Sequence, residues 1–330
     1  MTVRIGLLAA SRIAVRAVLE PAASVDGVEV TAVAARDPLR AREMAVAWGI
    51  GSAFDSYEEL VASDEIDAVY IGTPAALHRR WSSAAIEAGL HVLCEKPLAA
   101  NAADAALVAS AAAASDRVVM EAFHWRYHPF VDTMRAGLEM LGPLSRVDAW
   151  FEVEDGRIGP GDIRWNMQLG GGSTMDLGCY AVAWGRWVVG SDPVVVSAVA
   201  DATPDGVDAW LTAELAWQGG ISGSVHSSMV APVGEGRGSG IVATGRHGTL
   251  QIDNPLAPQR GSTMTLDTPA GTEATHAGRS NTYFHQLVAF RDAVELGAAY
   301  PTTAADGVAN MAVVDECYLA AGLPARPTFE

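Results

Sequence analysis

The segment HVLCEKP, residues 91–97, runs from a short apolar stretch into a carboxylate, an amine and a proline. A lysine amine can transfer a proton when its surroundings allow it to lose its charge. A solvated loop would explain the charges of Glu95 and Lys96, because lysines at the ends of strands are usually exposed. A lysine held rigidly at the edge of a sheet would also explain Pro97, whose ring locks the backbone. The elements around the segment decide between these two interpretations.

Residues 1–122 alternate between short apolar runs and helical patterns. Continuous apolar runs of this kind are typical of parallel strands that are buried on both faces. The predicted strands are Val3–Leu8, Val28–Ala35, Asp67–Ile71, His91–Cys94 and Arg117–Ala122. Helix-start signals follow several of them, namely Asp37 before Pro38, Ser56 with Glu59, and Asn101. We therefore predict an α/β Rossmann domain, a doubly wound parallel sheet, over residues 1–122. Lys96 then lies at the carboxyl edge of that sheet, where open α/β sheets bind ligands.

Residues 123–330 have a different pattern. After a helix near His128–Met140, long β-rich runs appear at Ser145–Glu154, Val207–Trp217 and Ile221–Met229. The segment GRHGTLQID predicts a tight connection between two strands. Further helices are predicted at Ser173–Val189, Thr282–Leu296 and Thr303–Ala321. We predict a substrate-binding and dimerisation domain of the α+β class, with a large open, mainly antiparallel sheet. The glycine-rich segment Pro232–Ser239 is expected to be a flexible loop over this domain.

The first junction between strand and helix, IGLLAASRIA, is an incomplete phosphate-binding loop. The dinucleotide fingerprint has two glycines and a third small residue at the positions that Ala9, Ser11 and Ala14 occupy here. Glycine lets backbone amides approach a pyrophosphate at the helix N-terminus, whereas alanine and serine restrict φ and add bulk. An ordinary tight turn explains this segment as well as a cofactor loop does.

The end of the second predicted strand bears on the choice of cofactor. Arg36 lies roughly 20 residues beyond the loop, near the position of an acidic residue that would bind a free ribose 2′-hydroxyl. A guanidinium suits a 2′-phosphate instead. If a dinucleotide binds, the sequence therefore favours NADP(H) over NAD(H). The alternative is a solvated arginine that precedes the helix cap Asp37.

Several further motifs follow one another along the chain. They are Thr73-Pro74 with His78, Glu95-Lys96-Pro97, EAFHWRYHP at residues 121–129, GGGSTMDLGCY at residues 170–180 and YFHQ at residues 283–286. With these motifs the chain resembles the Gfo/Idh/MocA family of NAD(P)-dependent oxidoreductases over essentially its whole length. It looks most like the branch of D-xylose dehydrogenases and dimeric dihydrodiol dehydrogenases. It departs from the family pattern in the phosphate loop and at Ala75, where asparagine is common.

The resemblance implies hydride transfer between a nicotinamide and a hydroxyl or carbonyl group of a sugar, polyol or cyclic diol. It also implies that Lys96 and Tyr180 share the proton transfer, with Asp176 orienting substrate hydroxyls or Lys96. Asp176 lies four residues before Tyr180, a spacing that places both side chains on one face of a helix. A tyrosine on an apolar helix is otherwise usually a core residue, and an aspartate near a helix start can simply cap it. The resemblance suggests a cis bond before Pro97, although trans is commoner in general.

We expect the cofactor to contact the loop after the first strand and the ends of neighbouring strands. The expected contacts are Ala9, Ser11, Arg12, Ile13, Arg36, Thr73, Pro74, His78, Glu95 and Lys96. The candidates for the substrate pocket are Trp125, Arg126, Arg164 and Trp165, although the segment HWRYH can equally be a packed hinge between domains. His124 and His128 have a spacing that can bind a metal, but no acidic partner fits, and no metal site is expected.

The composition limits the partners. The formal net charge of −17 opposes binding to nucleic acid or to an anionic membrane. No apolar run reaches the length of about 18 residues that a membrane span needs, and the start of the chain predicts a strand rather than a signal peptide. Three cysteines without a CxxC spacing fit a reducing cytoplasm. Because the predicted helices are too few to cover both faces of the second sheet, we expect a homodimer or a higher homo-oligomer through its bare face.

Two alternatives to a dehydrogenase remain open at this level. A cofactor- or ligand-binding regulatory homologue could keep the fold without turnover, because a fold alone does not prove a function. A hydrolase or epimerase could use a tightly bound, recycled cofactor. The presence together of Lys96, Asp176 and Tyr180 favours the dehydrogenase.

Overall fold

The computed structural model describes residues 2–328, which form two compact units. The first unit contains residues 2–127 and Asn281–Val308, and the second contains His128–Ser280 and Ala309–Thr328. The sequence suggested a single boundary near residue 122, whereas the chain returns to the first unit near its end. The reason is the helix α9 (Thr282–Leu296), because its side chains Leu287 and Phe290 are buried in the core of the first unit.

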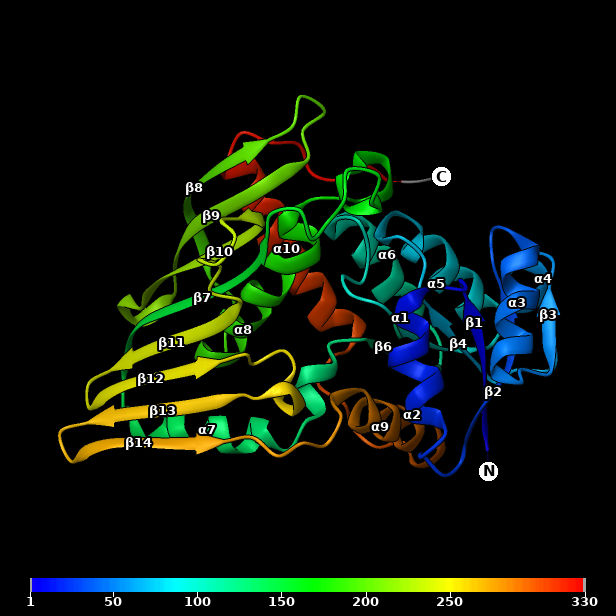
Figure 1. Cartoon of the computed structure of the whole chain (residues 1–330), viewed down its shortest axis with the longest axis horizontal. Coiled ribbons are helices and arrows are strands. Elements are labelled where there is room, and N and C mark those ends of the chain that lie inside the picture. The colour runs from blue at the N-terminus through cyan, green and yellow to red at the C-terminus, as the bar shows by residue number, and fades with distance from the viewer. Residues whose placement is uncertain (1, 329–330) are drawn as a thin grey trace. The chain divides into compact units, whose positions relative to one another are not determined.

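The first unit is built on a six-stranded parallel sheet, as predicted. Its strands are β1 (Val3–Leu8), β2 (Val28–Ala34), β3 (Ser52–Phe54), β4 (Ala68–Ile71), β5 (His91–Cys94) and β6 (Val119–Glu121). Their order in the sheet is β3-β2-β1-β4-β5-β6 (Figure 1). Only the short strand β3 is missing from the sequence-based prediction. The order reverses between β1 and β4, which is the point where doubly wound sheets bind their ligands.

Helices connect these strands, and three of them begin directly after a predicted cap. The helices are α1 (Arg12–Ala14), η1 (Val15–Leu19), α2 (Glu20–Ala22), α3 (Pro38–Trp48), α4 (Tyr57–Val61), η2 (Ala75–Leu77), α5 (His78–Glu87), α6 (Ala102–Ala113) and η3 (His124–Tyr127). The side chains of Asp37, Ser56 and Asn101 accept hydrogen bonds from the first turns of α3, α4 and α6. These bonds satisfy amides that have no partner within the helix.

The strand register brings the predicted site segments to one edge of the sheet. Leu8 pairs with Ile71, Ile71 with Cys94, and Cys94 with Glu121. The loops that follow β1, β4 and β5 therefore leave the sheet at the same edge. The phosphate loop, the Thr73-Pro74 turn and the Glu95-Lys96-Pro97 turn become neighbours, although they are far apart in the sequence.

The second unit contains an eight-stranded sheet. Its strands are β7 (Leu144–Glu154), β8 (Val194–Ala202), β9 (Asp208–Ala216), β10 (Ser222–Ala231), β11 (Ser239–Gly245), β12 (Gly248–Asp253), β13 (Thr263–Thr268) and β14 (Gly271–His276). The order is β14-β13-β12-β11-β7-β10-β9-β8, and every pair is antiparallel except β7 with β10 (Figure 1). The predicted connection in GRHGTLQID is the tight turn between β11 and β12. The mainly antiparallel sheet is thus confirmed.

Helices pack against one face of this sheet. They include α7 (Phe130–Met140), which contacts β12, and α8 (Cys179–Val189), which contacts β7, β10 and β11. A π-helical turn, η6 (Thr174–Gly178), leads into α8, and two short helical turns, η4 (Ile163–Trp165) and η5 (Met167–Leu169), precede it. The helix α10 (Ala304–Ala320) begins in the first unit and belongs to the second unit from Ala309 onward. Within residues 2–328 no helix is both long and apolar enough to cross a membrane.

Candidate active site

Lys96 lies in a turn that is anchored on both sides. The amide of Glu95 continues the pairing of β5 with β4, and the amide of Leu98 donates a 2.8 Å hydrogen bond to Oε1 of Glu121. The peptide bond between Lys96 and Pro97 is cis. Lys96 is half-buried, while its neighbours in the turn are buried. A backbone fixed in this way restricts the positions that the lysine amine can reach.

Two buried acidic residues support the same turn. Glu121 has no exposed surface, and Glu95 has 9%. Oε1 of Glu95 accepts a 2.7 Å hydrogen bond from the phenol of Tyr70 on β4. Burial, followed by the negative charge of Glu95, raises the pKa of Tyr70 well above its ordinary value, so this phenol remains a donor at neutral pH. Tyr70 and Glu121 support the site, although neither was among the predicted site residues.

His78 connects the lysine turn with the turn after β4. Its Nδ1 lies 2.7 Å from the carbonyl oxygen of Pro97, and its Nε2 lies 2.8 Å from the carbonyl oxygen of Thr73. Burial lowers the pKa of the imidazole, against the effect of these two carbonyl contacts. Three of the expected site residues, Thr73, His78 and Lys96, are therefore brought together, and His78 is packed between backbone segments.

Lys96 is the only lysine in the sequence, because the other 21 of the 22 lysine and arginine residues are arginines. An arginine cannot give up its proton in a protein, whereas a lysine can. Lysines that merely solubilise a surface would be expected at many positions. The single amine instead occupies an anchored turn at the carboxyl edge of the parallel sheet. This arrangement favours the positioned lysine over the solvated loop.

The loop after β1 keeps one backbone conformation typical of glycine although its glycines are missing. Ala9 adopts φ +112°, a conformation that usually requires glycine. Ser11 caps the following helix by accepting a 3.3 Å hydrogen bond from the amide of Ala14. Gly72, at the end of β4, leaves room for this loop, because a Cβ there would lie 3.0 Å from Oγ of Ser11. The residues present therefore fit a dinucleotide pyrophosphate, with Arg12 exposed beside the loop and Ile13 packed on the core.

Arginines surround the outer end of this loop. Arg36 is exposed, and its amide donates a 3.1 Å hydrogen bond to the hydroxyl of Tyr57. Arg40 donates a 2.9 Å hydrogen bond from Nη2 to the carbonyl oxygen of Ala10, which ties α3 to the loop. Burial raises the pKa of Tyr57, and the positive charges of Arg36 and Arg40 oppose this rise. Arg40 was missed in the sequence, and it lies in the first turn of α3, which begins at Pro38.

In the second unit, Arg164 and Asp176 form an ion pair. Nε of Arg164 lies 2.5 Å from Oδ2 of Asp176, and Nη1 lies 3.0 Å from Oδ1 of Asp162. The negative charge of Asp176, with a smaller effect of Asp162, raises the pKa of Arg164 above its ordinary value. The sequence predicted Arg164 and Asp176 as separate functional residues and missed Asp162. Their pairing places two carboxylates around one guanidinium.

Tyr180 lies in the first turn of α8 among aromatic side chains. Its ring centroid lies 5.9 Å from those of Phe151 and Trp184, and only 5% of its surface is exposed. Asp176 lies in the preceding π-helical turn, which was expected to be α-helical. Single π-helical turns of this kind are frequent at functional sites. Asp176 and Tyr180 both belong to the second unit, and Lys96 belongs to the first.

The remaining candidates lie in varied surroundings. Trp125 is fully buried, and the guanidinium carbon of Arg126 lies 5.4 Å from the centroid of its ring. Trp165 donates a 3.3 Å hydrogen bond to the carbonyl oxygen of Ile158. His124 lies 2.9 Å from the hydroxyl of Thr282 in the first unit. Trp125 is thus a buried residue of the first unit.

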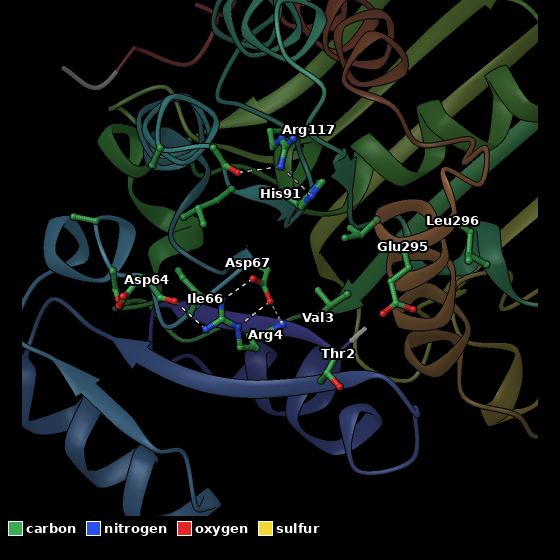
Figure 2. Close-up of a pocket in the computed structure, with 16 residues that line it drawn as sticks. Thr2, Val3, Arg4, Asp64, Ile66, Asp67, His91, Arg117, Glu295 and Leu296 are labelled. Atoms are coloured by element: carbon green, nitrogen blue, oxygen red, sulfur yellow. Dashed lines mark hydrogen bonds and ion pairs between the residues drawn. The ribbon is translucent and has the colours of Figure 1, made fainter.

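A groove of about 790 Å³ opens at the opposite, amino-terminal edge of the parallel sheet (Figure 2). Arg4 and Asp67 form an ion pair in it, with Nη2 and Oδ1 2.7 Å apart. Arg117 and His91 line the groove at the start of the neighbouring strands. Parallel α/β sheets bind ligands at the carboxyl edge, so this groove is not the candidate site.

Family models match both parts of the chain. Residues 3–123 match the model described as the oxidoreductase family with an NAD-binding Rossmann fold, GFO_IDH_MocA. Residues 138–251 match the model of the GFO/IDH/MocA C-terminal domain. Together the matches cover more than half of the chain.

Curated relatives and solved structures extend this similarity. D-xylose 1-dehydrogenase (NADP(+)) 2 of Haloferax volcanii is 34% identical over 95% of both chains. Trans-1,2-dihydrobenzene-1,2-diol dehydrogenase of Sus scrofa is 34% identical over 69% of this chain and 67% of its own. The structure of KijD10, a 3-ketoreductase from Actinomadura kijaniata in complex with NADP and TDP-benzene, has a TM-score of 0.87 at 25% identity and covers 97% of this chain and 98% of its own.

Proposed function

Because the chain belongs to the GFO/IDH/MocA family of oxidoreductases, we propose that it is an NADP(H)-dependent oxidoreductase of sugars, polyols or cyclic diols. The reaction interconverts a substrate hydroxyl and a carbonyl group. The observation that carries the proposal is the single lysine, held in an anchored turn beside a phosphate loop at the carboxyl edge of a parallel sheet. Two relatives named for xylose and a dihydrodiol support this range of substrates.

In this proposal the first unit, residues 2–127 with Asn281–Val308, binds the cofactor, and the second unit, His128–Ser280 with Ala309–Thr328, binds the substrate. The nicotinamide, when bound, supplies the hydride acceptor or donor. The loop with Ala9, Ser11, Arg12 and Ile13 faces the pyrophosphate with its amides and its helix N-terminus. The exposed guanidinium of Arg36 binds the 2′-phosphate, because Asp37 is already engaged as the cap of α3. The other proposed contacts are Thr73, Pro74, His78, Glu95 and Lys96.

Lys96 and Tyr180 transfer the hydroxyl proton in this proposal. Lys96 has an amine that can give up a proton, and its anchored turn restricts where the amine lies. The phenol of Tyr180 lies among Phe151 and Trp184, which exclude water from it. Asp176, held by Arg164, binds substrate hydroxyls. Arg126, Arg164 and Trp165 are substrate contacts in this proposal, whereas the fully buried Trp125 supports the guanidinium of Arg126.

We also propose that the enzyme is a cytoplasmic homodimer or higher homo-oligomer. Helices pack on one face of the second sheet, and the edge strand β8 exposes Val194, Val196 and Val199, each more than 60% accessible. Exposed valines on an edge strand are usually covered by a partner. The three cysteines, all within the described residues, are buried and form no disulfide, which fits a reducing compartment.

The test is a titration with NADPH and with NADH, read by tryptophan and nicotinamide fluorescence. We expect NADPH to bind more tightly, and Arg36→Ala to weaken NADPH binding by about 10- to 100-fold with little change for NADH. The control is Arg42→Ala, an exposed arginine on the following helix, α3, that pairs with Asp55. Turnover of a sugar or diol panel then follows. If neither nucleotide binds, the proposal is wrong and a non-catalytic homologue takes its place.

A further inference from the structure

A buried carboxylate in the second unit collects donors from three chain segments. Asp208, the first residue of β9, has no exposed surface. Its Oδ2 accepts 2.7 Å hydrogen bonds from the hydroxyl of Ser173 and from the amide and the hydroxyl of Thr174. Its Oδ1 accepts a 3.0 Å hydrogen bond from the hydroxyl of Tyr318 and another from Nη2 of Arg326. A carboxylate saturated in this way holds its donors in one geometry.

Arg326, in the segment after α10, is the cationic partner. Only 1% of its surface is exposed. Its Nε donates a 2.6 Å hydrogen bond to the carbonyl oxygen of Gly171, and its guanidinium carbon lies 4.0 Å from the centroid of the Tyr318 ring. The planar guanidinium thus spans Asp208 and the glycine segment at once. A lysine in its place could not make both contacts with one fixed fork.

Two glycines allow this close approach. Gly172 has φ +133°, and a Cβ there would clash with Asp208, Arg326 and the Tyr318 hydroxyl. A Cβ at Gly171 would lie 2.5 Å from the carbonyl oxygen of Arg164. These glycines of the GGGST segment are therefore needed because a side chain would collide with the buried ion pair or with the backbone of Arg164.

The same segment is hydrogen-bonded to the backbone of both members of the ion pair described for the candidate site. The amide of Gly172 donates a 2.9 Å hydrogen bond to the carbonyl oxygen of Arg164. The amide of Asp176 donates a 3.0 Å hydrogen bond to the carbonyl oxygen of Gly172. Gly172, which packs against Asp208 and Arg326, is thus hydrogen-bonded through its backbone to both Arg164 and Asp176.

We infer that Asp208 and Arg326 are positioning residues for the substrate half of the site. Their ion pair holds the segment Gly171–Thr174, which sets the backbone of Arg164 and the π-helical turn that bears Asp176. The expected effect on kinetics rests on the proposed function, whereas the expected effect on the backbone of this segment does not. Displacing a binding group by about 1 Å can lower a rate by about 100-fold.

The test is Arg326→Lys, which keeps the charge and removes the fork. Amide exchange is measured at Gly172, Thr174 and Asp176, and in parallel kcat, KM for the substrate and the Kd of NADPH. We expect faster exchange at these amides and a fall in kcat/KM of about 10- to 100-fold, with the Kd of NADPH unchanged. Arg260→Lys, at an exposed arginine of the same unit, should change none of these quantities.

The double variant Asp208→Leu/Arg326→Met provides a second test if the single variant does not fold. Apolar replacements of a buried ion pair often keep or raise stability. We expect a folded protein that retains NADPH binding but shows fast exchange at the three amides and a raised KM. Wild-type exchange and wild-type kinetics in a folded variant would overturn the inference. If the wild type turns over no substrate, the proposed function fails, and the exchange measurement still decides the positioning role.

Discussion

The phenol of Tyr70 donates a 2.7 Å hydrogen bond to Oε1 of Glu95, and both side chains are buried. Tyr70 lies on β4, and Glu95 directly follows β5, so the bond joins the ends of two neighbouring strands. It holds the residue that immediately precedes Lys96. A carboxylate that would otherwise be solvated thus becomes part of the support of the lysine turn.

Tyr70→Phe removes this donor and leaves the ring in place. We expect a loss of about 1–3 kcal/mol in the free energy of unfolding, because a buried carboxylate loses a hydrogen bond. We also expect a lower kcat, since the lysine turn loses one anchor. Urea unfolding and steady-state kinetics measure the two effects. Tyr300→Phe is the control, because that half-buried hydroxyl makes only long bonds to one residue, donating at 3.3 Å to the carbonyl oxygen of Val119 and accepting at 3.2 Å from its amide. Equal losses in both variants would contradict a special role for Tyr70.

Two substitutions distinguish the positive charge of Lys96 from its ability to release a proton. Lys96→Met should abolish turnover, and Lys96→Arg should do the same, because a guanidinium keeps the charge but does not release a proton. Both variants should bind NADPH with an affinity close to that of the wild type. Since Lys96 is the only lysine, selective lysine labelling with ¹⁵N gives a single side-chain signal for a direct titration. Activity retained in Lys96→Arg would show that charge alone suffices.

Ala9 occupies a backbone conformation that favours glycine, with φ +112°. Ala9→Gly should therefore raise the free energy of unfolding by about 1 kcal/mol, because relief of strain exceeds the entropy gained by the unfolded chain. NADPH should bind at least as tightly, since the loop keeps its shape. The control is Ala10→Gly, at a residue without positive φ, which should be neutral or destabilising. A loss of stability in Ala9→Gly would contradict the strained turn.

Arg164 forms ion pairs with both Asp176 and Asp162. Arg164→Ala should raise KM for the substrate and lower kcat/KM by about 10- to 100-fold, because Asp176 loses the group that orients it. Cofactor affinity should not change, since the ion pair belongs to the second unit. Arg157→Ala is the matched control, because Arg157 pairs with Glu154 at an exposed position. Similar kinetics in the two variants would remove Arg164 from the site.

The buried thiols predict how stability depends on pH. Burial raises the pKa of Cys317 from 9.0 to about 12, and burial also raises the pKa of Cys94. The folded state keeps these protons while the unfolded state loses them, so the free energy of unfolding should fall between about pH 9 and about pH 12. Each group contributes at most about 1.4 kcal/mol per pH unit. Urea unfolding at pH 8, 9 and 10 measures the slope, which should be shallower in Cys317→Ala. Rapid reaction of the native protein with a thiol reagent at pH 8 would contradict this burial.

Local patterns determined much of this fold in advance. Apolar runs of strand length, caps such as Asp37 and Asn101, and the tight turn in GRHGTLQID were confirmed as elements of the structure. These signals are local, because strand and helix periodicity and cap bonds involve residues a few positions apart. The position of Lys96 at the end of a strand follows from the same patterns. The strands β8, β13 and β14 were missed, and the edge strand β14 is exposed along its whole length and lacks an apolar signal.

The partners of the site residues were decided only by the tertiary structure. Arg164 could have faced solvent or substrate, and its bond to Asp176 depends on how the GGGST segment folds back on it. Asp208 and Arg326 are 118 residues apart, and neither stands in a motif that indicates the other. A buried charge requires an opposite charge and hydrogen-bond donors, but the packing of the whole chain determines which residues supply them. Sequence periodicity specifies which face of an element is buried, whereas the contact across that face is set by the assembled core.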